Sequence, residues 1–484
     1  MKDLVKTTAA IGSSEVLLMG VALARNKYLA VTIGPEGFGI YGLINSFFLM
    51  IAVFAGTWMA TGTIKYTSEY RAKGDKENLN KIFSFSTIIV AGIAIFLTII
   101  LILWRKWIIN TFLSNEVNEI YYLIFCAAFI GISIRPVLFG VLQGLKRVRE
   151  VIISRWSIAV LNLIFIIILI WLWGLTGFFL SLLVSAIFAV CILYWGIKRK
   201  DGLHLRTFSW QDPVIRLLLS FGIVNLFLAI VNLGGQYLQR FIIIHNMNIA
   251  SVGLFQAAVG IMLYLGVVNR GSTFYFFPKM SEVMDNSYRN QKINEYLRFI
   301  LLFSIPISVL AILFGKWVIL ILYSPAFFPL ASVFFLFVIA QLLVSIGSVF
   351  QLTIVGMARL KMHATSCIVM HSLSVLVVLL LIGKYGIGAL GYGSILGGLS
   401  GGFLNWLYLR NRIGLRLNRD VIRLFIIAAV SLTGAILFSD KMIILRVTLV
   451  VILVCFIAKM IRREEWKKVY NYILIKLGKT DDHS

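Results

Sequence analysis

The chain has 484 residues, of which 60% are hydrophobic and 13% are charged. Soluble globular proteins are roughly 45–50% apolar and about 25% charged, so this composition excludes a soluble enzyme, a disordered chain and a coiled coil. The formal net charge of +25 would suggest a nucleic-acid partner in a soluble protein, but basic residues also gather in the cytoplasmic loops of membrane proteins. We therefore interpret the sequence as a polytopic membrane protein with no nucleic-acid partner.

The apolar segments predict an all-α fold with about 14 transmembrane helices, because a helix needs about 20 apolar residues to cross a bilayer. The first segment follows two lysines but lacks a small-residue cleavage site, which favours a span over a cleaved signal peptide. Short turns at Gly174 and Gly386 join the fifth span to the sixth and the eleventh to the twelfth. In chain order, the predicted spans are 8–33, 38–60, 82–103, 118–142, 156–173, 175–197, 215–244, 251–277, 299–321, 328–354, 363–383, 386–409, 422–438 and 442–460.

The distribution of basic residues predicts which side of the membrane each loop faces. With the N-terminus inside, 34 of the 45 lysines and arginines fall in inner segments, and only Arg105, Lys106, Lys384 and Lys441 fall in outer loops. Basic residues favour the cytoplasmic side, so we expect a multi-pass protein of the cell inner (plasma) membrane with both termini in the cytoplasm. Residues 461–484 predict a basic amphipathic tail on the inner membrane surface.

Loop and span sequences recur at a nearly constant offset, which indicates an internal repeat. Gly-Ile-Tyr at 39–41 opens the second span, and Gly-Leu-Phe at 253–255 opens the eighth, 214 positions later. Gly-Leu-Lys-Arg at 144–147 is matched 212 positions later by Gly-Met-Ala-Arg at 356–359. The glycines of the two short turns keep the same offset, so each half has six spans in the same order and orientation.

This repeat predicts two six-helix bundles related by an axis along the membrane normal, an arrangement used by transporters that work by alternating access. We predict an N-terminal bundle over residues 1–205, a C-terminal bundle over 206–415 and two additional transmembrane helices over 416–460.

Charged side chains inside a span cost roughly 2.5–3.5 kcal/mol each on insertion scales, which makes each of them a candidate functional residue. Arginine is a preferred phosphate ligand because its planar fork binds two oxygens at once, so a cavity lined by arginines suits an anionic cargo. Structural roles stay open as alternatives to ligand binding. The charged ends of Lys27, Lys316 and Arg446 could reach the membrane surface along their apolar stems, and asparagine and glutamine side chains in the spans could join helices to one another. The predicted cavity cations are Arg25, Lys27, Arg135, Arg240 and Arg270, and the predicted sugar-binding amides are Asn225, Asn232, Gln236 and Asn269.

Glu15 is the one acidic residue well inside a predicted span. It lies ten residues from Arg25, about 15 Å along a helix, so direct neutralisation of that arginine is a poor explanation for it. Two interpretations stay open. Glu15 pairs with a cation on another helix, or it binds a coupling proton.

Two loop motifs resemble those of a known family. Gly-Pro-Glu-Gly-Phe-Gly-Ile-Tyr at 34–41 is similar to the first-loop signature of bacterial polysaccharide transporters. These are the O-antigen flippase type within the multidrug/oligosaccharidyl-lipid/polysaccharide (MOP) exporter superfamily. Gln-Gly-Leu-Lys-Arg at 143–147 resembles the family's loop after the fourth span, and the resemblance covers residues 5–410. It implies two six-helix bundles around a central cavity, and transport of an undecaprenyl-diphosphate-linked oligosaccharide from the inner to the outer leaflet.

Two other functions fit the sequence less well. A MATE-like antiporter of drugs or organic cations on the same fold favours buried acids, whereas this chain places several bases in its spans. A membrane polysaccharide polymerase or ligase needs a sizeable outer loop with paired acid and base groups, and the longest predicted outer loop, residues 104–118, is short. We therefore expect a transporter rather than an enzyme.

The sequence gives no sign of a metal or cofactor. Cys126, Cys191, Cys367 and Cys455 each lie in an apolar segment without CxxC spacing, which is typical of small packing side chains rather than of a disulfide framework or a metal site. No nucleotide-binding motif is present. The expected partners are the lipid-linked oligosaccharide, membrane lipids and the polysaccharide polymerase or assembly machinery, and we expect a monomer.

Overall fold

The computed structural model describes residues 2–201, 203–205, 212–282, 285–439 and 444–451. Within these ranges, side chains are described except at residues 2–16, 57, 200–201, 217, 220–225, 274–275, 278 and 281–282. The described ranges contain helices and turns but no strand. The elements are α1 (Lys2–Thr32), α2 (Gly34–Ala52), η1 (Val53–Thr57), α3 (Met59–Ala72), α4 (Lys76–Leu103), α5 (Arg105–Phe112), α6 (Glu119–Gly144), α7 (Val148–Asp201), α8 (Pro213–Asn246), α9 (Ile249–Leu265), α10 (Val267–Glu282), α11 (Asn286–Leu313), α12 (Gly315–Leu322), η2 (Pro325–Ser332), α13 (Phe334–Gly356), α14 (Leu360–Tyr385), α15 (Gly388–Ile413) and α16 (Arg419–Phe438).

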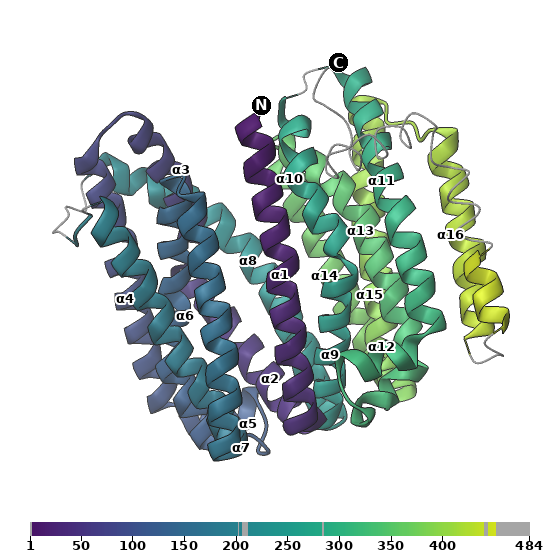
Figure 1. The fold of residues 1–484 in the computed structure, drawn as a ribbon, viewed down its shortest axis with the longest axis horizontal. Coiled ribbons are helices and arrows are strands. Elements are labelled where there is room, and N and C mark those ends of the chain that lie inside the picture. Colours follow the sequence, from purple (N-terminus) through teal and green to yellow (C-terminus); the bar gives the residue numbers. More distant parts are fainter. Residues whose placement is uncertain (1, 202, 206–211, 283–284, 440–443, 452–484) are drawn as a thin grey trace, which may run out of the picture.

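The helices stand side by side in two groups (Figure 1). The first group holds α2 to α7 and the second holds α9 to α16, while α1 lies between them. The long helix α8 joins the groups, because it packs against α2 and α3 in the first and against α14 in the second. We call the end of the molecule where α1 begins the upper end, and the end with the turn between α1 and α2 the lower end, as they appear in Figure 1.

The structure confirms the predicted all-α membrane fold. Nine of the described helices are long and apolar enough to cross a membrane, or ten if the bent pair α9 and α10 counts as one span. The predicted fourteenth span, 442–460, and the predicted tail, 461–484, fall largely or wholly outside the described residues. The count of fourteen spans therefore stays a prediction.

Helix α7 contains both the fifth and the sixth predicted spans. Its backbone leaves the helical region at Trp173 and Gly174, and a Cβ atom on Gly177 would overlap the carbonyl oxygen of Leu169. The chain therefore folds back on itself here as a helical hairpin. Across the hairpin, the side-chain amide of Asn162 donates a hydrogen bond of 2.8 Å to the hydroxyl of Ser185.

Turns in the two groups share their backbone geometry at the offset seen in the sequence. Lys146 and Ala358, 212 positions apart, have φ values of 54° and 55°, which residues other than glycine rarely adopt. Both turns make the same backbone hydrogen bonds. In the first turn, the N–H groups of residues 145, 146 and 147 donate to the carbonyl oxygens of residues 141, 143 and 142, respectively. In the second turn, the N–H groups of residues 357, 358 and 359 donate to the carbonyl oxygens of residues 353, 355 and 354. Gly174 and Gly386 also match, with φ values of 55° and 51°. The repeat is thus visible in the backbone, and the bundle boundaries at 205 and 415 stay a prediction.

The second predicted span of each half is a broken helix. In the first half, α2 passes through the π-helical turn η1, where Gly56 has a φ of 123°. In the second half, α9 ends at Leu265 and α10 continues after Gly266 with a bend of 48°. Gly56 and Gly266 are 210 positions apart. Broken helices of this kind line binding sites in transporters, because their freed backbone groups need partners other than lipid.

The two groups of helices meet at the lower end through α2 and α9. A Cβ atom on Gly39 would overlap the carbonyl oxygen of Ile249, and one on Gly253 would overlap that of Pro35. The helices therefore cross with their backbones in contact, as small residues allow in membranes. Beside this crossing, the ring of Phe38 packs edge to face against the rings of Tyr323 and Phe327, which also contact each other. The repeated motifs at 39–41 and 253–255 thus lie at the helix crossing that closes the lower end.

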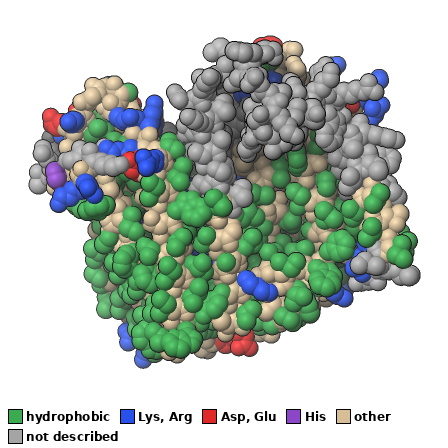
Figure 2. Space-filling view, in the orientation of Figure 1, with side chains coloured by type: hydrophobic (Ala, Val, Ile, Leu, Met, Phe, Trp, Pro, Cys, Tyr) green, Lys and Arg blue, Asp and Glu red, His purple; other side chains and the backbone are tan. Residues whose placement is uncertain are grey.

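The surface shows the belt expected of a membrane protein (Figure 2). Apolar side chains cover the middle of the visible face, and most of the visible basic side chains gather at the upper end. The upper-end turns hold Lys73, Lys146 and Arg147, and Lys81 lies in the nearby first turns of α4, consistent with the sequence-based assignment of these segments to one side.

Candidate functional site

Three arginines line one cavity of about 720 Å³ inside the first group of helices. Arg25 comes from α1, Arg135 from α6 and Arg155 from the first half of α7. No carboxylate is found in this lining among the side chains that the structure describes. The remaining polar lining comes from Tyr41, Asn45, Gln143, Asn162 and Ser185.

The three arginines lie at different heights in the cavity. Arg155 is seven residues from the upper start of α7, and Arg135 is nine residues from the upper end of α6, so they lie about 10 and 13 Å below these helix ends. Arg25 is seven residues from the lower end of α1, about 10 Å above it. The positive charge therefore extends through much of the depth of the bundle.

Arg135 is the cavity arginine without a polar partner among the described residues. Its side chain is partly buried, and it makes no hydrogen bond or ion pair with the part of the chain that the structure describes. Two close glycine contacts hold its helix against α3: a Cβ atom on Gly140 would lie 2.9 Å from the carbonyl oxygen of Ala60, and one on Gly144 would lie 2.6 Å from Cβ of Thr67. A rigid helix thus holds a guanidinium group over the cavity, ready for a ligand.

Arg25 is held at the boundary between the two groups of helices. Its Nε and Nη2 atoms donate to Oδ1 of Asn26, at 3.3 and 3.2 Å, and Nδ2 of Asn26 donates to the hydroxyl of Tyr264 on α9 at 2.8 Å. Arg270 on α10 lies within electrostatic range of the same tyrosine. It is exposed, donates to the carbonyl oxygen of Leu263 and is not part of the cavity lining.

Lys27 lies outside the cavity lining. Its Nζ atom donates to the carbonyl oxygens of Leu320 and Tyr323, at the end of α12, where a cation is favoured by the exposed carbonyl groups and the helix dipole. The second half of the repeat contributes a similar contact, since the Tyr237 hydroxyl on α8 donates to the carbonyl oxygen of Phe112 at the end of α5. The first contact joins α1 to the second group and the second joins α8 to the first group, both at the lower end.

Arg240 is buried and bound by the protein itself. Its Nη2 and Nε atoms donate to Oε1 of Gln256 at 2.6 and 3.2 Å, and Nη1 donates to the carbonyl oxygen of Gln236 at 2.9 Å. The guanidinium carbon lies 5.3 Å from the centre of the Phe255 ring. These contacts join α8 to α9, and the structure does not bring Arg240 into the cavity lining.

The predicted sugar-binding amides are spread over several interfaces. Oδ1 of Asn269 accepts a hydrogen bond of 3.1 Å from the Tyr296 hydroxyl on α11, and Asn232 pairs with His371 on α14. The side chain of Gln236 is exposed. Asn225 and Glu15 lie outside the described side chains. None of the three described amides lines the cavity.

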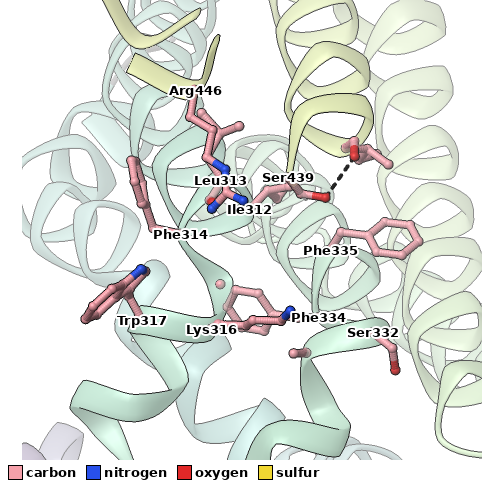
Figure 3. A pocket seen from close by; sticks show the side chains of 13 residues that line it. Ile312, Leu313, Phe314, Lys316, Trp317, Ser332, Phe334, Phe335, Ser439 and Arg446 are labelled. Carbon is pink, nitrogen blue, oxygen red and sulfur yellow. Dashed lines mark hydrogen bonds between the residues drawn. The ribbon is translucent and has the colours of Figure 1, made fainter. Parts of the chain in front are cut away.

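Lys316 and Arg446 line a separate, smaller cavity of about 300 Å³ at the lower end (Figure 3). Nη1 of Arg446 donates a hydrogen bond of 3.2 Å to the carbonyl oxygen of Leu313. Lys316 and Trp317 begin α12, and Ser439 follows α16, so this pocket lies between the core and the additional helices. Each of the two cations thus sits near a helix end.

Sequence reasoning missed Arg155 and the polar side chains around it. Arg155 belongs to the basic cluster after the fourth span and was assigned to an inner loop, whereas α7 starts at Val148 and places it inside the bundle. Helical spacing was the available signal, because Arg155, Ile158, Ala159 and Asn162 recur at intervals of three and four residues, on one face of a helix.

Cations beside a cavity within the membrane-spanning helices, together with broken helices, are features of membrane transporters. The sequence profile described as "Polysaccharide biosynthesis protein" matches residues 28–333. The chain therefore belongs to the polysaccharide biosynthesis protein family, as the loop motifs predict.

Curated relatives and solved structures agree with this family. The lipid III flippases of Escherichia coli (strain K12) and Shigella flexneri are each 20% identical to the chain over 364 residues, which is 75% of this chain and 87% of the relative. The lipid II flippase MurJ in its inward closed conformation matches with a TM-score of 0.73 at 16% identity, over 94% of this chain and all of MurJ.

Two other transporters share the fold. An inward-facing multidrug resistance MATE family transporter matches with a TM-score of 0.72 at 17% identity, over 81% of this chain and 94% of that one. A MOP superfamily transporter from Pyrococcus furiosus, described as having a binding pocket of reverse polarity, matches at 0.63 with 18% identity, over 85% and 95% of the two chains. The chain is therefore a multi-pass membrane protein with the fold of this superfamily.

Proposed function

We propose that the protein is a flippase that moves an undecaprenyl-diphosphate-linked oligosaccharide from the inner to the outer leaflet. The observation that carries this proposal is the cavity of the first group, which has three arginines and no described carboxylate in its lining. A cation in a low-dielectric site is unfavourable unless an anion binds it, and Arg135 has no hydrogen-bond or ion-pair partner among the described residues. The relatives named as flippases of lipid II and lipid III support a lipid-linked cargo.

The cavity lining offers side chains that can bind both the diphosphate and the sugars of such a headgroup. A guanidinium group binds two phosphate oxygens at once, and Arg135 has no competing hydrogen-bond or ion-pair partner among the described residues. Asn45, Gln143 and Asn162 offer amide donors and acceptors to sugar hydroxyls. A volume of about 720 Å³ is in the usual range of small-molecule sites, roughly 300–1,000 Å³. The polyprenyl tail stays in the lipid.

The packing at the lower end supports alternating access. The crossing of α2 and α9 seals that end, while the exposed Gln143 extends the cavity lining toward the upper end. In our proposal the upper end faces the cytoplasm, the headgroup binds there, and the two groups then rock so that α2 and α9 separate. Because the cytoplasm is electrically negative, outward movement of an anion is downhill by about 2.3 kcal/mol per charge per 100 mV.

The positive charge of the cavity lining distinguishes this function from that of a drug or organic-cation antiporter with the same fold. Organic cations are bound by carboxylates and aromatic faces, whereas the charged lining here is positive throughout its described part. A polymerase or ligase needs a paired acid and base, which the described lining does not offer. In our proposal the protein acts as a monomeric, non-catalytic transporter that supplies a polysaccharide polymerase or assembly machinery.

A transport assay with purified protein in lipid vesicles tests the proposal. A polyprenyl diphosphate carrying a fluorescent oligosaccharide is placed in the vesicles, and the probe in each leaflet is measured by its accessibility to an external quencher. We expect the protein to speed exchange of this probe at least about tenfold over empty vesicles, and to leave a cationic dye where it is. Transport of the dye without exchange of the diphosphate probe would contradict the proposal.

A further inference from the structure

A partly buried hydrogen bond joins α8 to α14 away from the arginine-lined cavity. Nε2 of His371 lies 3.0 Å from Oδ1 of Asn232, and Nδ2 of Asn232 donates to the carbonyl oxygen of Leu228 at 2.8 Å. Because the amide nitrogen is already a donor, Oδ1 is the acceptor and Nε2 of the histidine carries the proton. In the neutral ring, the lone pair is then on Nδ1.

Nδ1 of His371 faces the backbone of α8 rather than a polar group. A Cβ atom on Gly235 would lie only 2.8 Å from Nδ1, so the ring edge packs against a position that only glycine can occupy. The backbone donors and acceptors of α8 are used within the helix. A second proton, on Nδ1, would point at a glycine Cα and would have no acceptor, so the charged ring does not fit the observed packing.

The surroundings of His371 contain no described charge that would stabilise the protonated ring. Helices α8, α13 and α15 pack against α14, and the nearest titratable neighbours are Cys367, whose thiol faces Asn232, and His363, which pairs with Gln351 at 3.2 Å. No charged side chain in the described part of these helices acts electrostatically on His371. The cations of α8, α14 and α15 that the structure describes sit elsewhere: Arg216, Arg240, Lys361, Lys384, Arg410 and Arg412.

We infer that His371 is a proton-binding site, and that its protonation releases α8 from α14 and so couples proton movement to the opening of the cavity. The contact is well placed for this role, because α8 packs against α2 and α3 in the first group and against α14 in the second. The neutral ring belongs to the arrangement in which α2 and α9 seal the lower end. Protonation favours separation of α2 from α9, and loss of the proton restores the contact.

This inference rests on the proposed flippase function, because the protonated ring favours the open lower end through which the cargo leaves. No covalent bond changes in the step. The imidazole gains a proton at Nδ1 from water on one side and loses it to water on the other. Histidine is suited to this exchange because its charge changes between about pH 5 and 8.

The matched substitutions are His371→Gln and His363→Gln. Glutamine at 371 keeps an N–H donor for Asn232 but cannot take a second proton, and His363 is a second buried histidine on the same helix. In vesicles at a fixed membrane potential, we expect the parent and His363→Gln to change their transport rate at least about fivefold between pH 5 and 8. We expect the rate of His371→Gln to change less than about twofold over the same range.

Nitrogen NMR of the histidine-labelled protein in lipid gives a readout that does not depend on transport, since the chain has only five histidines. We expect a neutral ring protonated on Nε2 that converts to the doubly protonated form on acidification, and whose signal is missing in His371→Gln. Retained pH dependence in His371→Gln, or a ring that never gains a proton, would overturn the inference. If the signal converts as expected but the parent moves no diphosphate probe, the proposed function fails and the proton site stands.

Discussion

Replacing Arg135 with glutamine is expected to lower the rate of flipping by about 10- to 100-fold. A hydrogen bond to a charged group contributes about 1.5–3 kcal/mol, and each 1.36 kcal/mol is a factor of ten in rate. We choose Arg135 because its side chain has no hydrogen-bond or ion-pair partner among the described residues. Arg135→Lys keeps the charge but not the two-pronged geometry, so its rate is expected to lie between those of the parent and the glutamine variant.

The matched control for this experiment is Arg105→Gln. Arg105 is also an arginine, but it pairs with Glu119 at the lower end and does not line the cavity. It is therefore expected to keep the parental rate within about twofold, as is typical of an exposed ion pair. Equal rates for the parent and Arg135→Gln, measured with the same diphosphate probe, would show that the cavity charge plays no part in transport.

Adding a methyl group at the α2 and α9 crossing is expected to nearly abolish transport. The Cβ atom of Gly39→Ala or Gly253→Ala would overlap a backbone carbonyl oxygen of the facing helix segment, and backbone cannot move aside as a flexible side chain can. Overpacking costs about 1–3 kcal/mol, which shifts the balance between the closed and open lower end by up to about 100-fold. We expect both variants to favour the arrangement that is open at the lower end.

Gly92→Ala on α4 is the control, because nothing lies within 4 Å of the added atom. Accessibility of the lower end to a membrane-impermeant thiol reagent, measured with a cysteine at Tyr41 in the cavity lining, separates a shifted equilibrium from a failure to fold. A cysteine that stays unreactive in Gly39→Ala, in a protein that transports at the parental rate, would show that the crossing still closes around the added methyl group and would contradict this prediction.

Much of the fold could be predicted because it depends on features that are local in the sequence. The lengths of the apolar segments predicted the helices. The glycines at 174 and 386 predicted the two tight turns, because positive φ values favour glycine. The breaks at Gly56 and Gly266 were not predicted. A glycine inside an apolar span does not by itself show whether the helix continues, because that depends on the packing of neighbouring helices.

The site could be predicted only in part. Arg25 and Arg135 stood out as charges inside apolar spans, and both line the cavity. Lys27 and Arg240 stood out in the same way, yet one binds the end of α12 and the other binds Gln256. The partner of a long side chain is set by helices distant in sequence, so hydropathy alone does not distinguish a ligand-binding cation from one that holds two helices together.

Photochemical capture of the cargo tests the central claim most directly. A benzoylphenylalanine replaces Ile158, which lines the cavity, or Ile164, which lies on the exposed face of the same helix α7. After illumination with a labelled polyprenyl diphosphate oligosaccharide, the account predicts strong labelling at 158 and little at 164, with the labelling at 158 lost when Arg135→Gln is added. Equal labelling at the two positions, or labelling at 158 that persists without Arg135, would contradict the account.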